Sequence, residues 1–205
     1  MVHFAQLPRQ AIRKFDQDLR SAKSNKESLI SEYGLALAHS KNNDHEDALQ
    51  FMRNALNKDK DNLLIQIGIL EVHISAENYS EAEALAIYLL QLHPNNYPIS
   101  MLYTQILTNK GDYVKGEEVL RTLTLKRQND PQIWYWLAEV QGLDKNIIGL
   151  HLSRAEYFYL TGSYDTSLKH LRMALELVGN NFQLSETIHN KIERSHKSIE
   201  ALKST

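Results

Sequence analysis

Cysteine is missing from the chain, which excludes disulfide bonds and thiol chemistry but does not select a cellular compartment. Proline and glycine are sparse, and the sequence contains no glycine-rich phosphate loop, no Gly/Ser linker and no low-complexity segment. No stretch is apolar enough to span a bilayer, and no signal-peptide pattern begins the sequence. A strand pattern is also absent, so the 205 residues predict one continuous, all-helical domain.

An excess of charge of either sign is missing as well. The chain has 23 basic and 25 acidic residues, which leave a formal net charge of −2 and a pI near 6.5. Nucleic-acid binding depends on clustered cations that release counterions from phosphate. The densest basic stretch, residues 9–26, is diluted by acidic side chains and indicates a solvated helix face. We therefore expect no nucleic-acid partner.

Catalytic and metal-binding patterns are incomplete. The segment from His45 to Leu49 begins like the zinc-protease motif HExxH, but Leu49 stands where the second histidine ligand is required. His189 and His196 lie seven residues apart with no third ligand nearby, which favours surface histidines. The sequence accordingly predicts no catalytic residues, no metal and no cofactor. An unrecognised hydrolase is the weakest alternative.

Small residues recur at a fixed interval. Ala48, Ala82 and Gly116 are 34 positions apart, and Asp44, Asn78 and Asp112 precede them at the same interval as good helix N-cap residues. A small residue is needed where two helices cross closely. This pattern resembles the tetratricopeptide repeat (TPR), a helix–turn–helix unit of 34 residues. The resemblance predicts repeats at Leu29–Asn62, Leu63–Asn96 and Tyr97–Asp130.

After the third repeat the interval changes. The next matching small residue, Ser167, follows Gly116 by 51 positions, which indicates an inserted half-unit that begins at Pro131. We predict a TPR-type α-solenoid of about eleven helices with this irregular half-repeat and a C-terminal capping helix. Its segments are an extra N-terminal helix in 1–26, with helical residues from Pro8 to about Lys23, three TPR repeats in 27–130, the half-repeat in 131–147, a further TPR-like repeat in 148–181 and the capping helix in 182–205.

The first helices of stacked TPR units line a concave groove, and a few positions of each helix point into it. The predicted partner-binding groove is apolar toward the N-terminus and more polar further along, which is typical of a partner site. The alternative is that the N-terminal helix or the half-unit fills it. The predicted lining consists of Ile30, Tyr33, Leu37, Lys41, Leu64, Ile67, Glu71, Ile74, Met101, Gln105, Asn109, Tyr135 and Glu139.

The TPR clamp that holds chaperone C-terminal carboxylates needs cationic and amide side chains at four groove positions. These positions carry Tyr33, Leu37, Pro98 and Leu102 in this chain. A buried carboxylate would find no hydrogen-bond partner there. Binding of chaperone tails in that manner is therefore excluded.

Particular strings carry a closer resemblance, to the C-terminal TPR region of bacterial HExxH zinc metallopeptidases of the β-barrel assembly-enhancing protease type. The strings are Tyr33-Gly34-Leu35-Ala36-Leu37-Ala38, Leu92-His93-Pro94-Asn95-Asn96-Tyr97-Pro98, Asp130-Pro131 through Trp134 to Leu137-Ala138-Glu139, and His151-Leu152-Ser153-Arg154-Ala155-Glu156-Tyr157. The resemblance covers residues 29–181, and the peptidase domain has no counterpart in this sequence.

This resemblance implies a periplasmic, non-catalytic module that brings substrates or outer-membrane assembly proteins to a zinc protease. Its partners would be proteins or peptides, including the peptidase domain itself. The alternative is a free-standing TPR scaffold or chaperone adaptor that holds a helix or an extended peptide in its groove.

Overall fold

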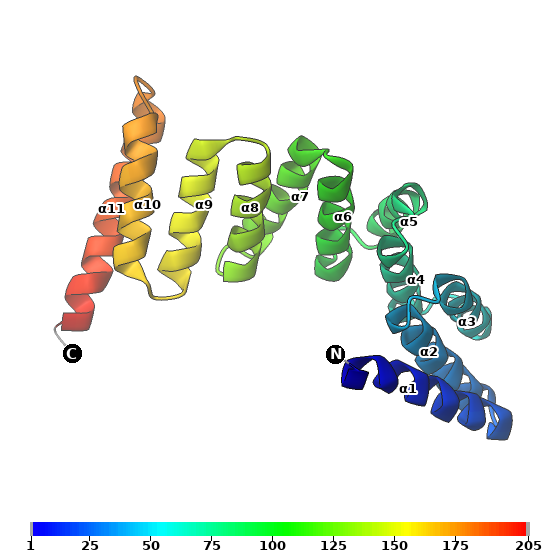
Figure 1. Cartoon of the computed structure of the whole chain (residues 1–205). Helices are drawn as coiled ribbons and strands as arrows, with labels where there is room; N and C mark the ends of the chain where they lie inside the picture. Colours follow the sequence, from blue (N-terminus) through cyan, green and yellow to red (C-terminus); the bar gives the residue numbers. More distant parts are fainter. Residues whose placement is uncertain (1, 204–205) are drawn as a thin grey trace. The chain divides into compact units, whose positions relative to one another are not determined.

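The computed structural model describes residues 2–203 and, from Leu7 onward, their side chains. All regular structure in this part of the chain is helical, and no strand occurs in it (Figure 1). Residues 1, 204 and 205 of the predicted terminal segments lie outside the described range. The helices are α1 (Val2–Ser21), α2 (Asn25–Lys41), α3 (His45–Lys58), α4 (Leu63–Ser75), α5 (Tyr79–Leu92), α6 (Tyr97–Lys110), α7 (Tyr113–Lys126), α8 (Pro131–Leu143), α9 (Ile147–Leu160), α10 (Tyr164–Leu177) and α11 (Phe182–Lys203).

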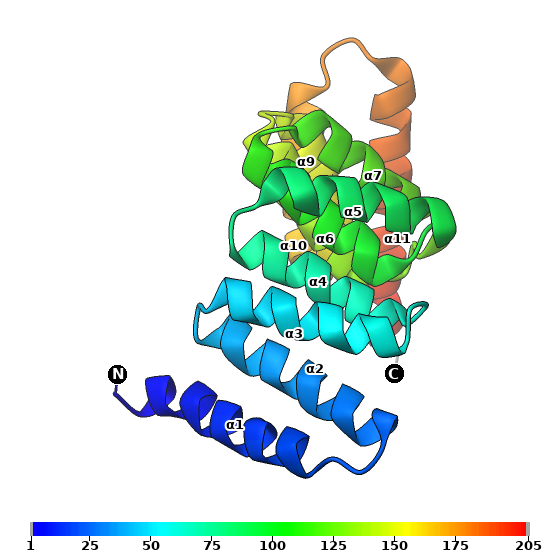
Figure 2. The same ribbon diagram turned by 90° about the vertical axis from the view of Figure 1, so that its right-hand side faces the viewer.

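The helices fall into two compact units, and each is described by itself. Unit 1 extends to Ile106 and holds α1 to α5 with most of α6, whereas unit 2 begins at Leu107 and holds the end of α6 with α7 to α11. In unit 1, α1, α2, α3 and α4 lie as successive tiers (Figure 2). In unit 2, α8, α9, α10 and α11 each pack against the next (Figure 1). The single continuous domain stays a prediction.

The 34-residue interval is visible in the backbone. The second helices α3, α5 and α7 begin 34 residues apart, as the spacing of the small residues predicts. The turn before each one contains a residue with a left-handed backbone: Asn43 (φ 64°), Glu77 (φ 58°) and Gly111 (φ 79°). Such a conformation suits glycine and asparagine better than glutamate, so the tertiary packing imposes it at Glu77.

The irregularity of the repeat centres on α9. Lys145 (φ 61°) precedes α9 and continues the 34-residue series of left-handed turns, but the next such turn, at Gly162 (φ 78°), follows after only 17 residues. In the regular repeats this tight turn alternates with a connection of four residues, at 59–62 and 93–96. Helix α9 is thus flanked by two tight turns, so it is the second helix after α8 and also the first helix before α10.

Small residues do sit at the helix crossings. Ala36, Ala48, Ala55 and Ala82 are buried in unit 1, and Ala155, Ser167 and Ala174 are buried in unit 2. The apolar cores form between neighbouring helices. One cluster in unit 1 joins α4, α5 and α6 through Leu70, Ile74, Ala82, Ala86, Leu89, Ile99 and Ile106, and one in unit 2 joins α9, α10 and α11 through Ala155, Leu171, Ala174, Val178 and Ile188.

The predicted N-caps occupy the expected positions but do not cap with their side chains. Asp44, Asn78, Asp112 and Ser163 each precede a helix, and none of their side chains accepts a hydrogen bond from the first turn. The Asp44 carboxylate instead contacts Asn42 and His39, and the Asp112 carboxylate pairs with Lys115. The prediction of side-chain capping was therefore wrong, because the tight turn directs these groups to other partners.

Helix α1 begins before Pro8, so the predicted start at this residue was wrong. Proline fixes φ at a helical value, and a helix can continue through it with the loss of one backbone hydrogen bond. On its inner side, the Phe15 ring lies over Gly34 of α2, 2.6 Å from where a Cβ atom would stand. Met52 of α3 lies in the same way over Gly68 of α4, one repeat later. Helix α1 therefore takes the place that a second helix takes before the next first helix.

Candidate functional site

The N-terminal half of the predicted groove forms an exposed surface in unit 1. We call it the unit 1 groove face, and it consists of Ile30, Tyr33, Leu37 and Lys41 on α2 with Leu64, Ile67 and Glu71 on α4. The two helices are in contact, and each set follows helical spacing. Ile30 is 54% exposed, Leu37 36% and Leu64 60%. The face therefore presents three large aliphatic side chains to solvent.

Three polar members of the groove face come together at its centre. The Tyr33 ring reaches Gly68 of α4, 3.5 Å from where a Cβ atom would stand. Burial, together with the charge of Glu71, raises the pKa of the Tyr33 hydroxyl. Burial raises the pKa of Glu71, and the charge of Lys41 offsets only part of that effect. The sequence placed these three residues on one surface, and the structure has them close enough to influence one another.

The N-terminal helix borders this face without covering it. A pocket of about 460 Å³ lies between α1 and α2, lined mainly by apolar side chains. Leu37 and Lys41 of the groove face stand on its α2 wall, and Phe15 stands on its α1 wall. Because Ile30 and Leu37 keep their exposure beside α1, that helix extends the groove instead of filling it. The lining is Leu7, Pro8, Ala11, Phe15, Gly34, Leu37, Ala38 and Lys41.

The other predicted lining residues have mixed positions. Ile74 is only 7% exposed and belongs to the core of α4, α5 and α6, so it offers a partner almost no surface. Its inclusion in the groove was wrong, because the last turn of α4 inclines toward α5. Met101 is half-buried, and Gln105 and Asn109 are exposed side chains that make contacts within the chain.

Tyr135 and Glu139 belong to a cluster on α8 and α9 of unit 2. Arg154 pairs with Glu139, and its guanidinium lies 5.2 Å from the centre of the Tyr135 ring. Tyr135 also meets the edges of Trp136 and Tyr157, with ring centres 5.6 and 5.7 Å apart. These two predicted groove residues thus have partners inside unit 2.

A histidine pair in unit 2 carries no signal in the sequence. The Nδ1 atoms of His151 on α9 and His170 on α10 lie 3.0 Å apart, and the ring centres are 5.3 Å apart. The ring separation is little more than the Nδ1 distance plus the two ring radii, so the nitrogen lone pairs point at one another. This geometry fits one linear N–H···N hydrogen bond between neutral rings, in which one Nδ1 donates and the other accepts.

We expect this pair to make unit 2 less stable in acid. Burial lowers the pKa of both rings, and the charges of His151 and Arg154 lower that of His170 further. The unfolded chain binds protons near pH 6.5, about the ordinary histidine pKa, whereas the folded pair resists them. The free energy of unfolding should therefore be complete above that pH and fall as the pH decreases to 5, in urea titrations at each pH.

A matched pair of variants tests the assignment of this acid effect. His170→Phe keeps a ring against Phe158, which stacks on His170 with centres 5.4 Å apart, but removes the shared proton. Its loss of stability between pH 7 and 5 should be smaller than that of the natural chain. His189→Gln, a change at an exposed histidine of α11, should leave the loss as it was. An equal loss in both variants would contradict the role of the pair.

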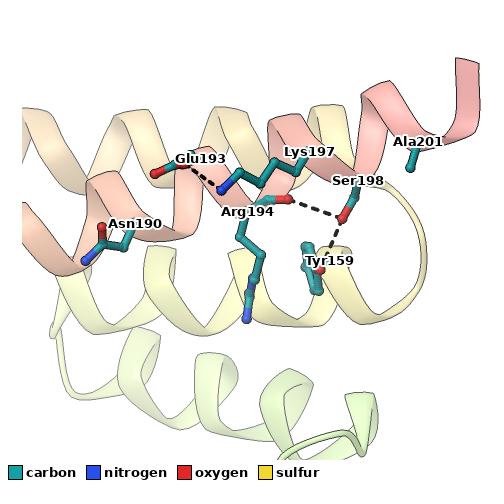
Figure 3. A pocket seen from close by; sticks show the side chains of 7 residues that line it. All are labelled: Tyr159, Asn190, Glu193, Arg194, Lys197, Ser198 and Ala201. Atoms are coloured by element: carbon teal, nitrogen blue, oxygen red, sulfur yellow. Dashed lines mark hydrogen bonds and ion pairs between the residues drawn. The ribbon is translucent and has the colours of Figure 1, made fainter. Parts of the chain in front are cut away.

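Helix α11 is held to α9 by charge. The Glu156 carboxylate, with its side chain 8% exposed, pairs with Lys191 and Arg194, and the Arg194 guanidinium lies 3.8 Å over the Tyr159 ring. Figure 3 shows the shallow pocket beside this contact, where the Tyr159 hydroxyl lies 3.1 Å from the Ser198 hydroxyl and Lys197 pairs with Glu193. The charged groups of this pocket thus pair with one another, and they indicate a structural contact.

One group of possible metal ligands occurs among the described residues. The ligand atoms of His39, Asp44 and Asp47 lie within 4.8 Å of one another at the turn from α2 to α3. His39 Nδ1 is 3.2 Å from an Asp44 oxygen that also accepts from Asn42, and its ring stacks on Phe51. These contacts account for the group as a fastening of the turn. His45, which begins the incomplete HExxH pattern, lies 3.3 Å from Ser75 Oγ.

None of the described helices combines the length and the apolar character needed to cross a membrane. The family described as tetratricopeptide repeat matches residues 74–140 of the chain. No curated protein matches the sequence. The match is to a repeat that typically serves as a non-catalytic binding module, and no catalytic family is indicated.

Several solved structures have a similar fold. A double mutant of MamA RS-1 is 14% identical, with a TM-score of 0.58 over 84% of this chain and 97% of that one. A tetratricopeptide repeat protein from Parabacteroides merdae is 13% identical, with a TM-score of 0.59 over 93% and 78%. YrrB, described as a TPR protein with an unusual peptide-binding site, is 16% identical, with a TM-score of 0.57 over 92% and 97%. The fold is therefore all-α and of the TPR solenoid type.

Proposed function

We propose that the chain is a protein–protein interaction module that binds a peptide or helix of a partner on the unit 1 groove face. The carrying observation is that Ile30, Leu37 and Leu64 remain exposed beside the partly buried carboxylate of Glu71. Adjacent aliphatic side chains in water are costly, and covering them with a partner removes that cost. The peptide-binding site attributed to the similarly folded YrrB is in keeping with this proposal.

Substitutions on and off the face test it. A peptide-display library is selected on the full chain, and the affinities of enriched peptides are measured by fluorescence anisotropy. Leu37→Asp should weaken binding by about tenfold or more, because an interface residue at the centre of a buried patch contributes on that scale. Ile87→Asp places the same charge on an exposed aliphatic position of α5 and should change the affinity little.

Thermal unfolding of both variants checks that the fold is kept, since both positions are exposed and tolerate polar side chains. Equal weakening by both variants, or selection of no peptide at all, would contradict the proposal. Peptides that bind equally well to the natural chain and to Leu37→Asp would place the binding surface elsewhere.

The finer proposal is that the chain is the TPR domain of a periplasmic zinc metalloprotease, where it recruits substrates or outer-membrane assembly proteins and modulates the protease. The four sequence strings between Tyr33 and Tyr157 support it. Titration of the chain against the cognate peptidase domain and against outer-membrane assembly proteins tests it. We expect binding to at least one of them, and binding to neither would refute this role.

The alternative proposal is a free-standing TPR scaffold or chaperone adaptor with the same groove. The coding sequence upstream of Val2 discriminates between the two. An in-frame domain with HExxH supports the protease module, whereas a stop codon supports the scaffold. Both readings use the unit 1 groove face, so its variants serve either case.

A further inference from the structure

We propose that the segment bound by the unit 1 groove face carries a lysine or arginine between aliphatic side chains, and that Glu71 receives this cation. The inference rests on the proposed function and specifies the chemistry of the partner. It is carried by the position of the Glu71 carboxylate, by its lack of an ion-pair partner and by the aliphatic side chains on either side of it.

Glu71 has no partner of its own. Across the described residues, no side chain forms a hydrogen bond or an ion pair with its carboxylate. Lys41 is near enough to act through its charge, but it forms no ion pair with Glu71. The acidic Glu32 on α2, by contrast, pairs with Lys58 of α3 at 2.5 Å. Glu71 is therefore an acceptor that the unit leaves unused.

The environment of Glu71 favours a cation over a hydroxyl or an anion. Burial raises its pKa despite the charge of Lys41, so its ionised form lacks part of the solvation it would have in water. A cation brought by a partner restores that stabilisation, whereas a second carboxylate would be repelled. Residues 1–106 contain ten basic and thirteen acidic side chains, which gives unit 1 a net charge of −3 and attracts cationic segments at long range.

Aliphatic side chains surround the carboxylate on the groove face. Ile67 precedes Glu71 by one helical turn and Leu64 by two, so the three form one stripe along α4. Tyr33 and Leu37 form the facing stripe on α2. A bound segment that extends its cation to Glu71 would place neighbouring side chains on these two stripes. Leucine, isoleucine, valine or methionine beside the cation would cover the exposed area of Leu37 and Leu64.

Display selection on two versions of the full chain tests the inference. A random dodecapeptide library is selected in parallel on the natural chain and on Glu71→Gln, which keeps the shape of the side chain and removes its charge. We expect peptides from the natural chain to share a Lys or Arg flanked by aliphatic residues. In one such peptide, Arg→Gln should weaken binding to the natural chain by about tenfold, as loss of a hydrogen bond to a charged group does.

The same peptide pair is then measured on two variants. On Glu71→Gln the Arg and Gln peptides should bind equally, while Glu46→Gln, at an exposed position of α3, should preserve the tenfold preference. Enriched peptides without a basic residue, or with an acidic one, would overturn this inference and leave the proposed function standing. Preference for arginine that survives Glu71→Gln would also overturn it. Recovery of no groove-dependent peptide would refute the proposed function as well.

Discussion

Replacing both Lys191 and Arg194 by methionine is expected to destabilise unit 2 by about 3–5 kcal/mol, because the change leaves Glu156 buried and ionised without a cation. The Glu156 side chain is 8% exposed, and these two residues of α11 are its ion-pair partners. Methionine keeps much of the aliphatic stem of each side chain, so the loss reports the charges. Urea unfolding at pH 7, followed by circular dichroism, measures the difference.

The pH dependence of the same variant is equally specific. In the natural chain, burial raises the pKa of Glu156, but the charges and hydrogen bonds of Lys191 and Arg194 outweigh it and hold the pKa below its usual value. Its stabilising contribution is thus complete above about pH 4.3, the ordinary glutamate pKa, and is lost as the pH falls through the lowered one. In the double variant only burial acts, so protonation should lessen the deficit as the pH falls toward 4.5.

A third substitution is the control for this result. Adding Glu156→Gln to the double variant removes the buried charge and should recover a large part of the lost stability. The exposed pair of Lys197 and Glu193 on the same helix offers a second control, since Lys197→Met should cost less than about 1 kcal/mol. A double variant as stable as the natural chain would mean that Glu156 is better solvated than the structure shows.

The substitution Leu70→Ala is expected to lower the free energy of unfolding by about 2–5 kcal/mol, the range for truncating a fully buried leucine. Leu70 is completely buried between α4, α5 and α6, where Ala82 and Ala86 leave room for its side chain. The substitution opens a cavity that the packed helices close only partly. Leu64→Ala on the same helix, where the leucine is mostly exposed, should cost far less.

Hydrogen exchange separates local damage from global damage in the Leu70→Ala variant. Repeats in such folds contact mainly their neighbours, so exchange should accelerate most in α4, α5 and α6. Amides of α10 and α11 should change little. Uniform acceleration across all helices would contradict the neighbour-by-neighbour division of the core.

The fold was largely readable from particular small residues. Ala48 and Ala82 mark crossings at the predicted interval, because only a small side chain fits there. Leu70 and Leu89 occupy positions where small residues are typical, yet both are buried, since alanines on α5 compensate for their size. A single repeat position does not reveal such an exchange across a helix pair. The side chains of the predicted N-caps have other partners for a similar reason, because tertiary contacts compete with local capping.

The candidate site was predictable in part. Helical spacing alone was enough to place Tyr33, Lys41 and Glu71 on one surface, since both helices are regular there. The burial of Ile74 depends on how the end of α4 inclines toward α5, which spacing does not give. The contact of His151 with His170 joins two helices with no shared motif. At α9, the close approach uses Gly149, where an added Cβ would meet the side chains of Asn146 and Gln141, one position earlier than the interval requires.

The double use of α9 reverses the parity of the helix count. Up to α8, the first helices of the repeats carry even numbers, whereas α9 and α11 take that part beyond it, as the contacts of Glu156 with α11 illustrate. A profile laid along the chain in fixed steps of 34 would therefore exchange the inward and outward sides of every helix after α9. Grafting or consensus design on this scaffold would need a separate numbering frame for α10 and α11.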